Sequence, residues 1–143
     1  MRVAVRKPKR QNKEDSHQIT LMNWSRVVRL PDLPNVKPNS RLIDYLFHIP
    51  NGGKRGKIEA AIFKKMGTKA GVSDLFLPIP MDGKAGLWIE LKAPYNSTTE
   101  KNYPTQAQKT WLGLMALAGF KTAVCYGWFE AREVINNYLN LKD

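Results

Sequence analysis

The chain has 143 residues, with 23 Lys and Arg against 12 Asp and Glu, and a formal net charge of +11 at pH 7. This length suits one domain, and an apolar fraction of 43% is enough for a core. The single cysteine, Cys125, excludes an internal disulfide. One cysteine and two histidines far apart in the sequence argue against a zinc site. No apolar run is long enough to cross a bilayer.

The positive charge favours a polyanionic partner, nucleic acid above all, and the alternative is a basic surface that is only solvated. A lone cysteine favours a reducing, cytoplasmic setting. Residues 1–12 are basic and lack apolar periodicity, so we expect a flexible N-terminal arm followed by a single domain over residues 13–143.

The N-terminal half predicts helix, loop, strand, loop and helix. The first helix is expected from about residue 15 to 29, because one stripe holds Glu14, His17, Leu21, Trp24 and Val28. The prolines after it indicate a loop. The remaining elements are expected at these positions: loop 30–40, strand 41–49, basic loop 50–56, and helix 57–67 ended by Gly67.

The C-terminal half begins with two strands, 74–80 and 86–92, whose short connection predicts a hairpin. A long loop then leads into the last three elements, which are helix 105–118, strand 121–127 and helix 128–141. Helices and strands in this order indicate an α/β fold, with a small mixed sheet flanked by helices.

The segment GLWIELK (86–92) looks like a buried strand, yet Glu90 and Lys92 share one of its faces. The hairpin should bring Asp74, at the start of the preceding strand, close to both. Converging carboxylates need a positive charge between them, and hard oxygen ligands suit Mg²⁺. With the lysine, these groups suffice for metal-assisted phosphodiester hydrolysis. The alternative is a structural Glu90–Lys92 ion pair, with Asp74 a turn residue.

Five segments occur in this order along the chain: HIPNGGKR, GVSDLFLPIP, GLWIELKAP, QKTWL and AGFKTAVCYGW. Across them, from about Glu14 to Leu141, the chain resembles the VRR-NUC family of the PD-(D/E)XK nuclease superfamily, whose stand-alone members of this size are typical of phages and bacteria. The resemblance implies a restriction-endonuclease-like core and DNA endonuclease activity that depends on Mg²⁺ or Mn²⁺. It also implies a homodimer acting on branched DNA such as Holliday junctions. One departure is Ser73, where proline is common before the aspartate.

The resemblance assigns the metal ligands to Asp74, Glu90 and the backbone carbonyl of Leu91. It assigns the orientation or activation of the attacking water to Lys92. A further catalytic role falls on Gln108, which helical spacing places on the inward face of its helix. The alternative for Gln108 is a capping box with Thr105, in which it only closes the helix N-terminus.

The resemblance also gives Glu14 a catalytic role, through an acidic position on the first helix. The alternative for Glu14 is an acid that merely favours the positive end of the helix dipole, and Asp15 competes for the same alignment. In the loop that contains Gly52 and Gly53, the candidate DNA contacts are Asn51, Lys54 and Arg55, or else the loop is a solvated turn.

The competing functional class is a non-catalytic nucleic-acid-binding module, which would use the same positive charge without chemistry. A structural phage component that binds nucleic acid during assembly is a third class. Both leave the acidic pair and its lysine unexplained, because a pure binder gains little from carboxylates near phosphate.

Overall fold

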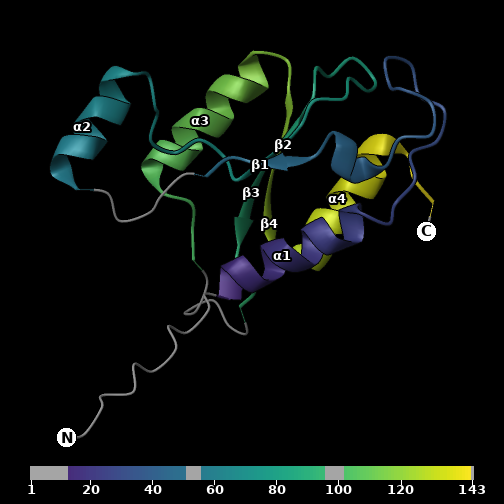
Figure 1. The fold of residues 1–143 in the computed structure, drawn as a ribbon, viewed down its shortest axis with the longest axis horizontal. Coiled ribbons are helices and arrows are strands. Elements are labelled where there is room, and N and C mark those ends of the chain that lie inside the picture. Colours follow the sequence, from purple (N-terminus) through teal and green to yellow (C-terminus); the bar gives the residue numbers. More distant parts are fainter. Residues whose placement is uncertain (1–12, 51–55, 96–101, 143) are drawn as a thin grey trace, which may run out of the picture.

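The centre of the molecule is a four-stranded mixed sheet in the order β1-β2-β3-β4 (Figure 1). The computed structural model describes residues 13–50, 56–95 and 102–142. Strand β2 (Leu75–Leu77) pairs antiparallel with β3 (Leu87–Lys92), and β3 pairs in parallel with β4 (Lys121–Tyr126). A two-residue strand, β1 (Phe47–His48), lies antiparallel at the edge. The expected hairpin and mixed α/β sheet are thus confirmed.

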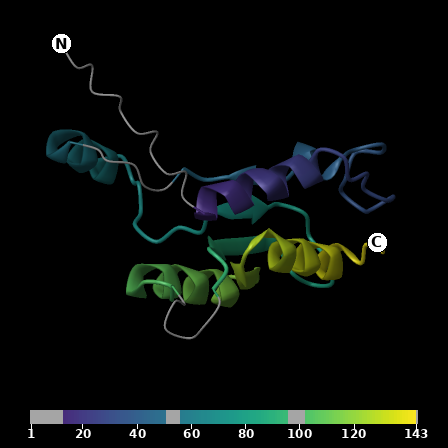
Figure 2. The same cartoon turned by 90° about the horizontal axis from the view of Figure 1, so that it is seen from below.

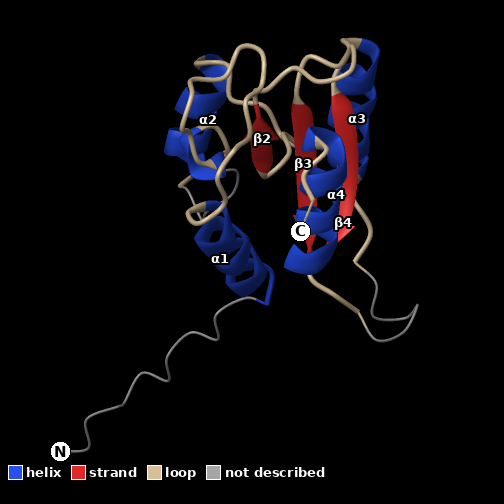
Figure 3. Cartoon of the chain, turned by 90° about the vertical axis from the view of Figure 1, so that its right-hand side faces the viewer, coloured by secondary structure: helices blue, strands red, loops and turns tan. Residues whose placement is uncertain are grey.

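Helices cover both faces of the sheet. Helix α1 (Lys13–Ser25) packs against α4 (Trp128–Leu139) on one face, and α3 (Gln106–Leu117), the crossover between the parallel strands β3 and β4, covers the other. Figure 3 shows α4 in front of β3 and β4, and α3 behind β4. Because both faces are covered, all six residues of β3 are buried.

The apolar core lies between the sheet and the pair formed by α1 and α4. Leu21 of α1, Ile89 and Leu91 of β3 and Ile135 of α4 are fully buried in it. Burying one such side chain is worth about 1.5–3 kcal/mol. Glu90 and Lys92 point to the other face of β3, toward α3. The core therefore fixes the strand that carries the candidate catalytic groups without using those groups for packing.

Helix α2 (Lys57–Lys65) stands apart from the sheet at one end of the molecule (Figures 1 and 2). None of its residues is buried. Within the described parts of the chain, no helix is both long and apolar enough to cross a membrane.

The strand expected over residues 41–49 is mostly wrong. Leu42–Asp44 form a 3₁₀ helix instead, and only Phe47–His48 are extended. The Asp44 carboxylate accepts a 2.8 Å hydrogen bond from the Arg41 backbone N–H and so stabilises the tight turn. Leu42 and Leu46, one helical turn apart, are both buried.

The first helix is shorter than expected at its C-terminal end, stopping at Ser25 rather than Arg29. The Ser25 hydroxyl donates to the Met22 carbonyl over 2.6 Å. After it, the chain pairs with the end of the proline-rich loop, through hydrogen bonds from Leu30 to Ser40 and from Leu42 to Val28. The N–H groups of Arg26 and Val27 still bond back to the last turn of the helix, and the tertiary hydrogen bonds take over from Val28 onward.

Candidate active site

Asp74 faces Glu90 because of the register between β2 and β3. Leu75 lies opposite Ile89, so the next position outward sets Asp74 opposite Glu90 on the same face of the sheet. Glu90 is 1% exposed, whereas Asp74 is partly exposed. The predicted convergence of the two carboxylates at one end of the hairpin is present in the structure.

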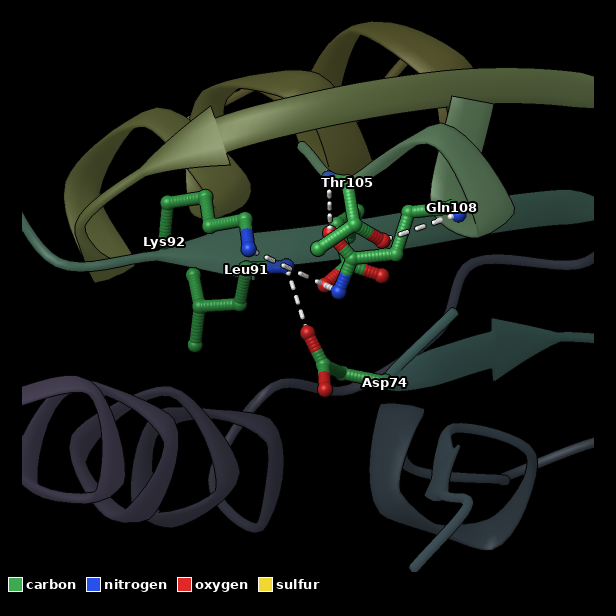
Figure 4. A network of polar contacts seen from close by, with 6 residues as sticks. Asp74, Leu91, Lys92, Thr105 and Gln108 are labelled. Atoms are coloured by element: carbon green, nitrogen blue, oxygen red, sulfur yellow. Dashed lines mark hydrogen bonds and ion pairs between the residues drawn. The ribbon is translucent and has the colours of Figure 1, made fainter. Parts of the chain in front are cut away.

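The Leu91 backbone continues this arrangement. Its N–H donates to Asp74 Oδ2 over 2.8 Å (Figure 4), in place of the backbone partner that β2 would have supplied. In an antiparallel ladder the N–H and C=O of one residue point to the same neighbouring strand. The Leu91 carbonyl therefore also points to the edge where Asp74 lies, while its side chain is buried in the core.

Gln108 connects α3 to this pair of carboxylates. Its Nε2 donates to Glu90 Oε1 over 2.8 Å, and its Oε1 accepts from the Thr105 backbone N–H over 2.8 Å. The Thr105 hydroxyl in turn accepts from the Gln108 backbone N–H. Gln108 therefore closes the predicted capping box and also contacts Glu90 (Figure 4), while its catalytic role stays a prediction.

Lys92 lies beside the same glutamate oxygen. Its Nζ is 3.9 Å from Glu90 Oε1, and the side chains of the two residues are only 7% and 2% exposed. An ammonium held this far from water is costly unless negative charge lies close. Lys92 therefore depends on the carboxylates of the site to offset its charge.

The electrostatics of the site centre on Glu90. Burial, followed by the charge of Asp74 and hydrogen bonding with it, raises the pKa of Glu90 to about 8, while Lys92 acts in the opposite direction. A hydrogen bond between two carboxyls needs a proton, which Glu90 keeps because its pKa is raised. Once Glu90 has lost that proton, its Oε2 is a buried acceptor that no donor among the described residues reaches.

Glu14 reaches the site from α1. It is half-buried and lines a cavity of about 430 Å³ that Asp74, Glu90 and Gln108 also line. Burial and the nearby Asp74 charge raise the pKa of Glu14. Asp15, which competed for this position in the sequence, is exposed.

Comparison with known proteins bears on this geometry. No protein-family model matches the sequence, and no curated protein is similar to it. A solved structure described as a "VRR_NUC domain protein" aligns with a TM-score of 0.71 and 34% sequence identity, covering 94% of this chain and 93% of the other.

This chain belongs to the VRR-NUC family. It is therefore a nuclease-type domain, and the resemblance seen in the five sequence segments is confirmed over nearly the whole chain. For a VRR-NUC domain, the convergence of Asp74, Glu90, Lys92 and Gln108 marks the end of the β2–β3 hairpin as the candidate active site.

The donor groups at this end of the hairpin fit a hard divalent cation. Glu90 Oε2 is buried without a hydrogen-bond donor, Asp74 Oδ atoms lie at the same edge, and the Leu91 carbonyl points there. Among the described residues no three His, Cys, Asp or Glu side chains cluster to bind a metal ion. Two carboxylates and one carbonyl would suit Mg²⁺, which keeps several of its waters.

The predicted DNA contacts Asn51, Lys54 and Arg55 lie outside the described residues, as does the basic arm 1–12. They remain predictions for this VRR-NUC domain.

Two residues that position the site were not recognised from the sequence. Gly71 has a φ of +83°, and a Cβ there would lie 2.3 Å from the Ala107 carbonyl carbon in the first turn of α3. The absent side chain lets α3 approach closely enough for Gln108 to reach Glu90. The only signal in the sequence was the glycine itself, three residues before Asp74.

His17 is the second. Its Nδ1 accepts the Trp128 backbone N–H over 3.0 Å, so a side chain of α1 caps α4, whose own N-cap residue is Gly127. His17 lies one helical turn after Glu14 and thereby holds the helix that brings Glu14 to the cavity. The helical stripe in the sequence placed His17 on the same face as Glu14, but nothing in the sequence indicated its hydrogen bond to Trp128.

Proposed function

We propose that this VRR-NUC domain is a metal-dependent endonuclease that hydrolyses phosphodiester bonds in DNA, with a preference for branched DNA such as Holliday junctions. The observation that carries the proposal is the buried pairing of Glu90 with Asp74, Gln108 and Lys92 at one end of the β2–β3 hairpin. A binding module would suffer the cost of desolvating these charges without using them.

Each group of the site would have a separate role in the reaction. Asp74, Glu90 and the Leu91 carbonyl would hold Mg²⁺ or Mn²⁺, which when bound would polarise the phosphate and neutralise charge that develops on it. Lys92 would orient the attacking water. Gln108 donates to Glu90 Oε1 and would hold this carboxylate in one orientation. The net charge of +11 supports phosphate contacts elsewhere, so DNA affinity should fall steeply with salt.

The test is cleavage of labelled DNA by the full chain in Mg²⁺, Mn²⁺ or EDTA. The substrates are a four-way junction, a linear duplex and a single strand of shared sequence. The variant is Lys92→Met, which fills the buried site without charge, and the control is Lys121→Met at an exposed position on β4. We expect metal-dependent cleavage that Lys92→Met abolishes and Lys121→Met retains, with the junction cut fastest.

Wild-type protein that binds these DNAs but cuts none of them with either metal would contradict catalysis. It would favour the non-catalytic binding module. If the junction were cut no faster than the linear duplex, only the proposed preference for branched DNA would be overturned.

A homodimer would place two sites on the two strands that junction cutting requires. Its proposed interface is the apolar stripe formed by Ile58 and Ile62 on α2 and Met66 at its C-cap, whose exposed fractions are 80%, 52% and 75%. These side chains recur every four residues on one helical face, and exposed apolar patches mark interaction sites. Light scattering should give a dimer for the wild type and for Val27→Glu, at an apolar site elsewhere that is 74% exposed, but a monomer for Ile62→Glu. A monomeric wild type would overturn the proposed homodimer.

A further inference from the structure

A second cavity adjoins the candidate active site in the space between the end of α2 and α3. Its volume is about 520 Å³, and its lining includes Lys64, Lys69, Ala70, Ala107, Trp111 and Leu114. Lys69, Ala70 and Ala107 also line the cavity that holds Asp74 and Glu90. The two cavities therefore share a wall, and a strand with one phosphate at Glu90 would carry a neighbouring nucleotide to the second cavity.

The walls of this cavity combine two kinds of chemistry. Ala70, Ala107, Trp111 and Leu114 give an apolar surface, while Lys64 and Lys69 are exposed cations at its margin. The Trp111 ring is held perpendicular to that of Trp88, with centroids 5.3 Å apart. The volume falls in the usual range of small-ligand sites, about 300–1,000 Å³. Apolar walls beside cations match a flat base attached to phosphates.

We propose that this cavity binds the base of one unpaired nucleotide next to the cleaved phosphodiester, with Lys64 and Lys69 contacting the adjoining phosphates. The proposal rests on the function proposed above and extends it to the substrate. A base inside a duplex must unstack and unpair, at a cost of a few kcal/mol, before it can enter such a cavity. An unpaired base at a branch or in a single-stranded arm avoids that cost. The cavity thus selects DNA with unpaired nucleotides beside the cut.

The test uses a branched duplex with a single-stranded arm, because the branch fixes the register of the strand on the protein. The fluorescent base 2-aminopurine is placed at each arm position in turn, and its fluorescence on binding is measured in EDTA. The cleavage of matched substrates with an abasic nucleotide at the same positions is measured in Mg²⁺. The protein is the full chain as wild type, Leu114→Asp or Leu117→Asp.

Leu114→Asp introduces a carboxylate into the cavity. Leu117→Asp puts the same change on the same helix outside the cavity, and both positions are exposed, at 54% and 88%. We expect a fluorescence change at one arm position with wild type and Leu117→Asp that Leu114→Asp loses. Removing that base should lower kcat/KM about tenfold for the first two proteins, as loss of a stacked base does. It should have little further effect on Leu114→Asp.

The outcomes separate this proposal from the proposed function. Cleavage by wild type with no position-specific effect, or with the same effect in Leu114→Asp, would overturn the base cavity and leave the nuclease in place. A position-specific fluorescence change lost in Leu114→Asp, without cleavage, would keep the base cavity and overturn catalysis. The absence of both the fluorescence change and cleavage would overturn both proposals.

Discussion

Gln108 Nε2 donates to Glu90 Oε1 over 2.8 Å, which ties the first turn of α3 to the middle of the sheet. The same side chain accepts from the Thr105 N–H, so its position is fixed from both sides. Helix capping and positioning of the buried carboxylate are therefore one structural feature, and they can be separated by mutation.

Gln108→Ala should impair catalysis, and Thr105→Ala should impair only the helix end. Loss of the cap alone costs about 1 kcal/mol of stability. Gln108→Ala keeps the hydrogen bond to the Thr105 hydroxyl but removes the one from the Thr105 N–H and frees Glu90. We therefore expect a loss of stability no larger than that of Thr105→Ala, together with a fall in kcat of at least about tenfold, the effect of ~1.4 kcal/mol in the transition state. Urea denaturation and single-turnover cleavage measure the two effects. Equal cleavage by the two variants would show that the Glu90 contact is unimportant.

Stability of the metal-free protein should depend on pH through Glu90. Its pKa is raised to about 8 from 4.5, so between these values the folded protein holds a proton that the unfolded chain has released. Stability therefore falls as pH rises through this interval, by up to about 1.4 kcal/mol per pH unit, and is fully retained below it. Urea denaturation in EDTA from pH 4 to 9 measures the slope.

Glu90→Gln should flatten this profile of stability against pH, because an amide does not titrate. For the wild type, Mg²⁺ should increase stability most at high pH. Superimposable profiles of wild type and Glu90→Gln would refute the assignment of the pH dependence to this residue.

Gly71→Ala should destabilise the fold and displace α3. The new Cβ would lie 2.3 Å from backbone atoms of Ala107, at a φ of +83°. Left-handed strain costs roughly 1–2 kcal/mol and overpacking a further 1–3 kcal/mol. Gly67→Ala is the control, since Gly67 also has a positive φ, +102°, but nothing lies within 4 Å of its Cβ position. Thermal melts should place Gly71→Ala clearly below Gly67→Ala; matching melting temperatures would mean that the close approach to α3 is dispensable.

His17→Leu should weaken the start of α4 by removing the acceptor for the Trp128 N–H. A buried donor left without a partner costs about 1–3 kcal/mol. His17→Asn places an amide oxygen near the position of Nδ1, so it should recover part of the loss. The comparison is made by urea denaturation at pH 8. Failure of Asn to improve on Leu would indicate that ring packing, rather than the hydrogen bond, is what His17 supplies.

The candidate site was largely predictable because it depends on local periodicity. Alternation along β3 put Glu90 and Lys92 on one face, the hairpin brought Asp74 to them, and helical spacing turned Gln108 inward. Each inference needed only the geometry of a strand or a helix. The capping role of Gln108 followed equally well from spacing, and the sequence offered no reason to think that one amide would fill both roles.

What escaped prediction depends on contacts between distant parts of the chain. The His17–Trp128 hydrogen bond joins residues 111 positions apart, and the closeness of Gly71 to Ala107 follows from packing. The turn at Leu42–Asp44 was misread because its apolar residues also suit a strand, whereas the Asp44 cap favours the tight helix. The dimer and the preference for branched DNA stay predictions.

The complete burial of β3 has a consequence for the lifetime of the site. Backbone amides in a strand covered on both faces exchange with solvent only when the whole domain opens. Glu90 and Lys92 lie on that strand, so their geometry should persist as long as the fold does, rather than fluctuate with the loops around them. The Leu91 amide differs, because its partner is the Asp74 carboxylate instead of a backbone carbonyl. Its deuterium uptake should therefore report on the charge state of the site, at a single amide within an otherwise slow strand.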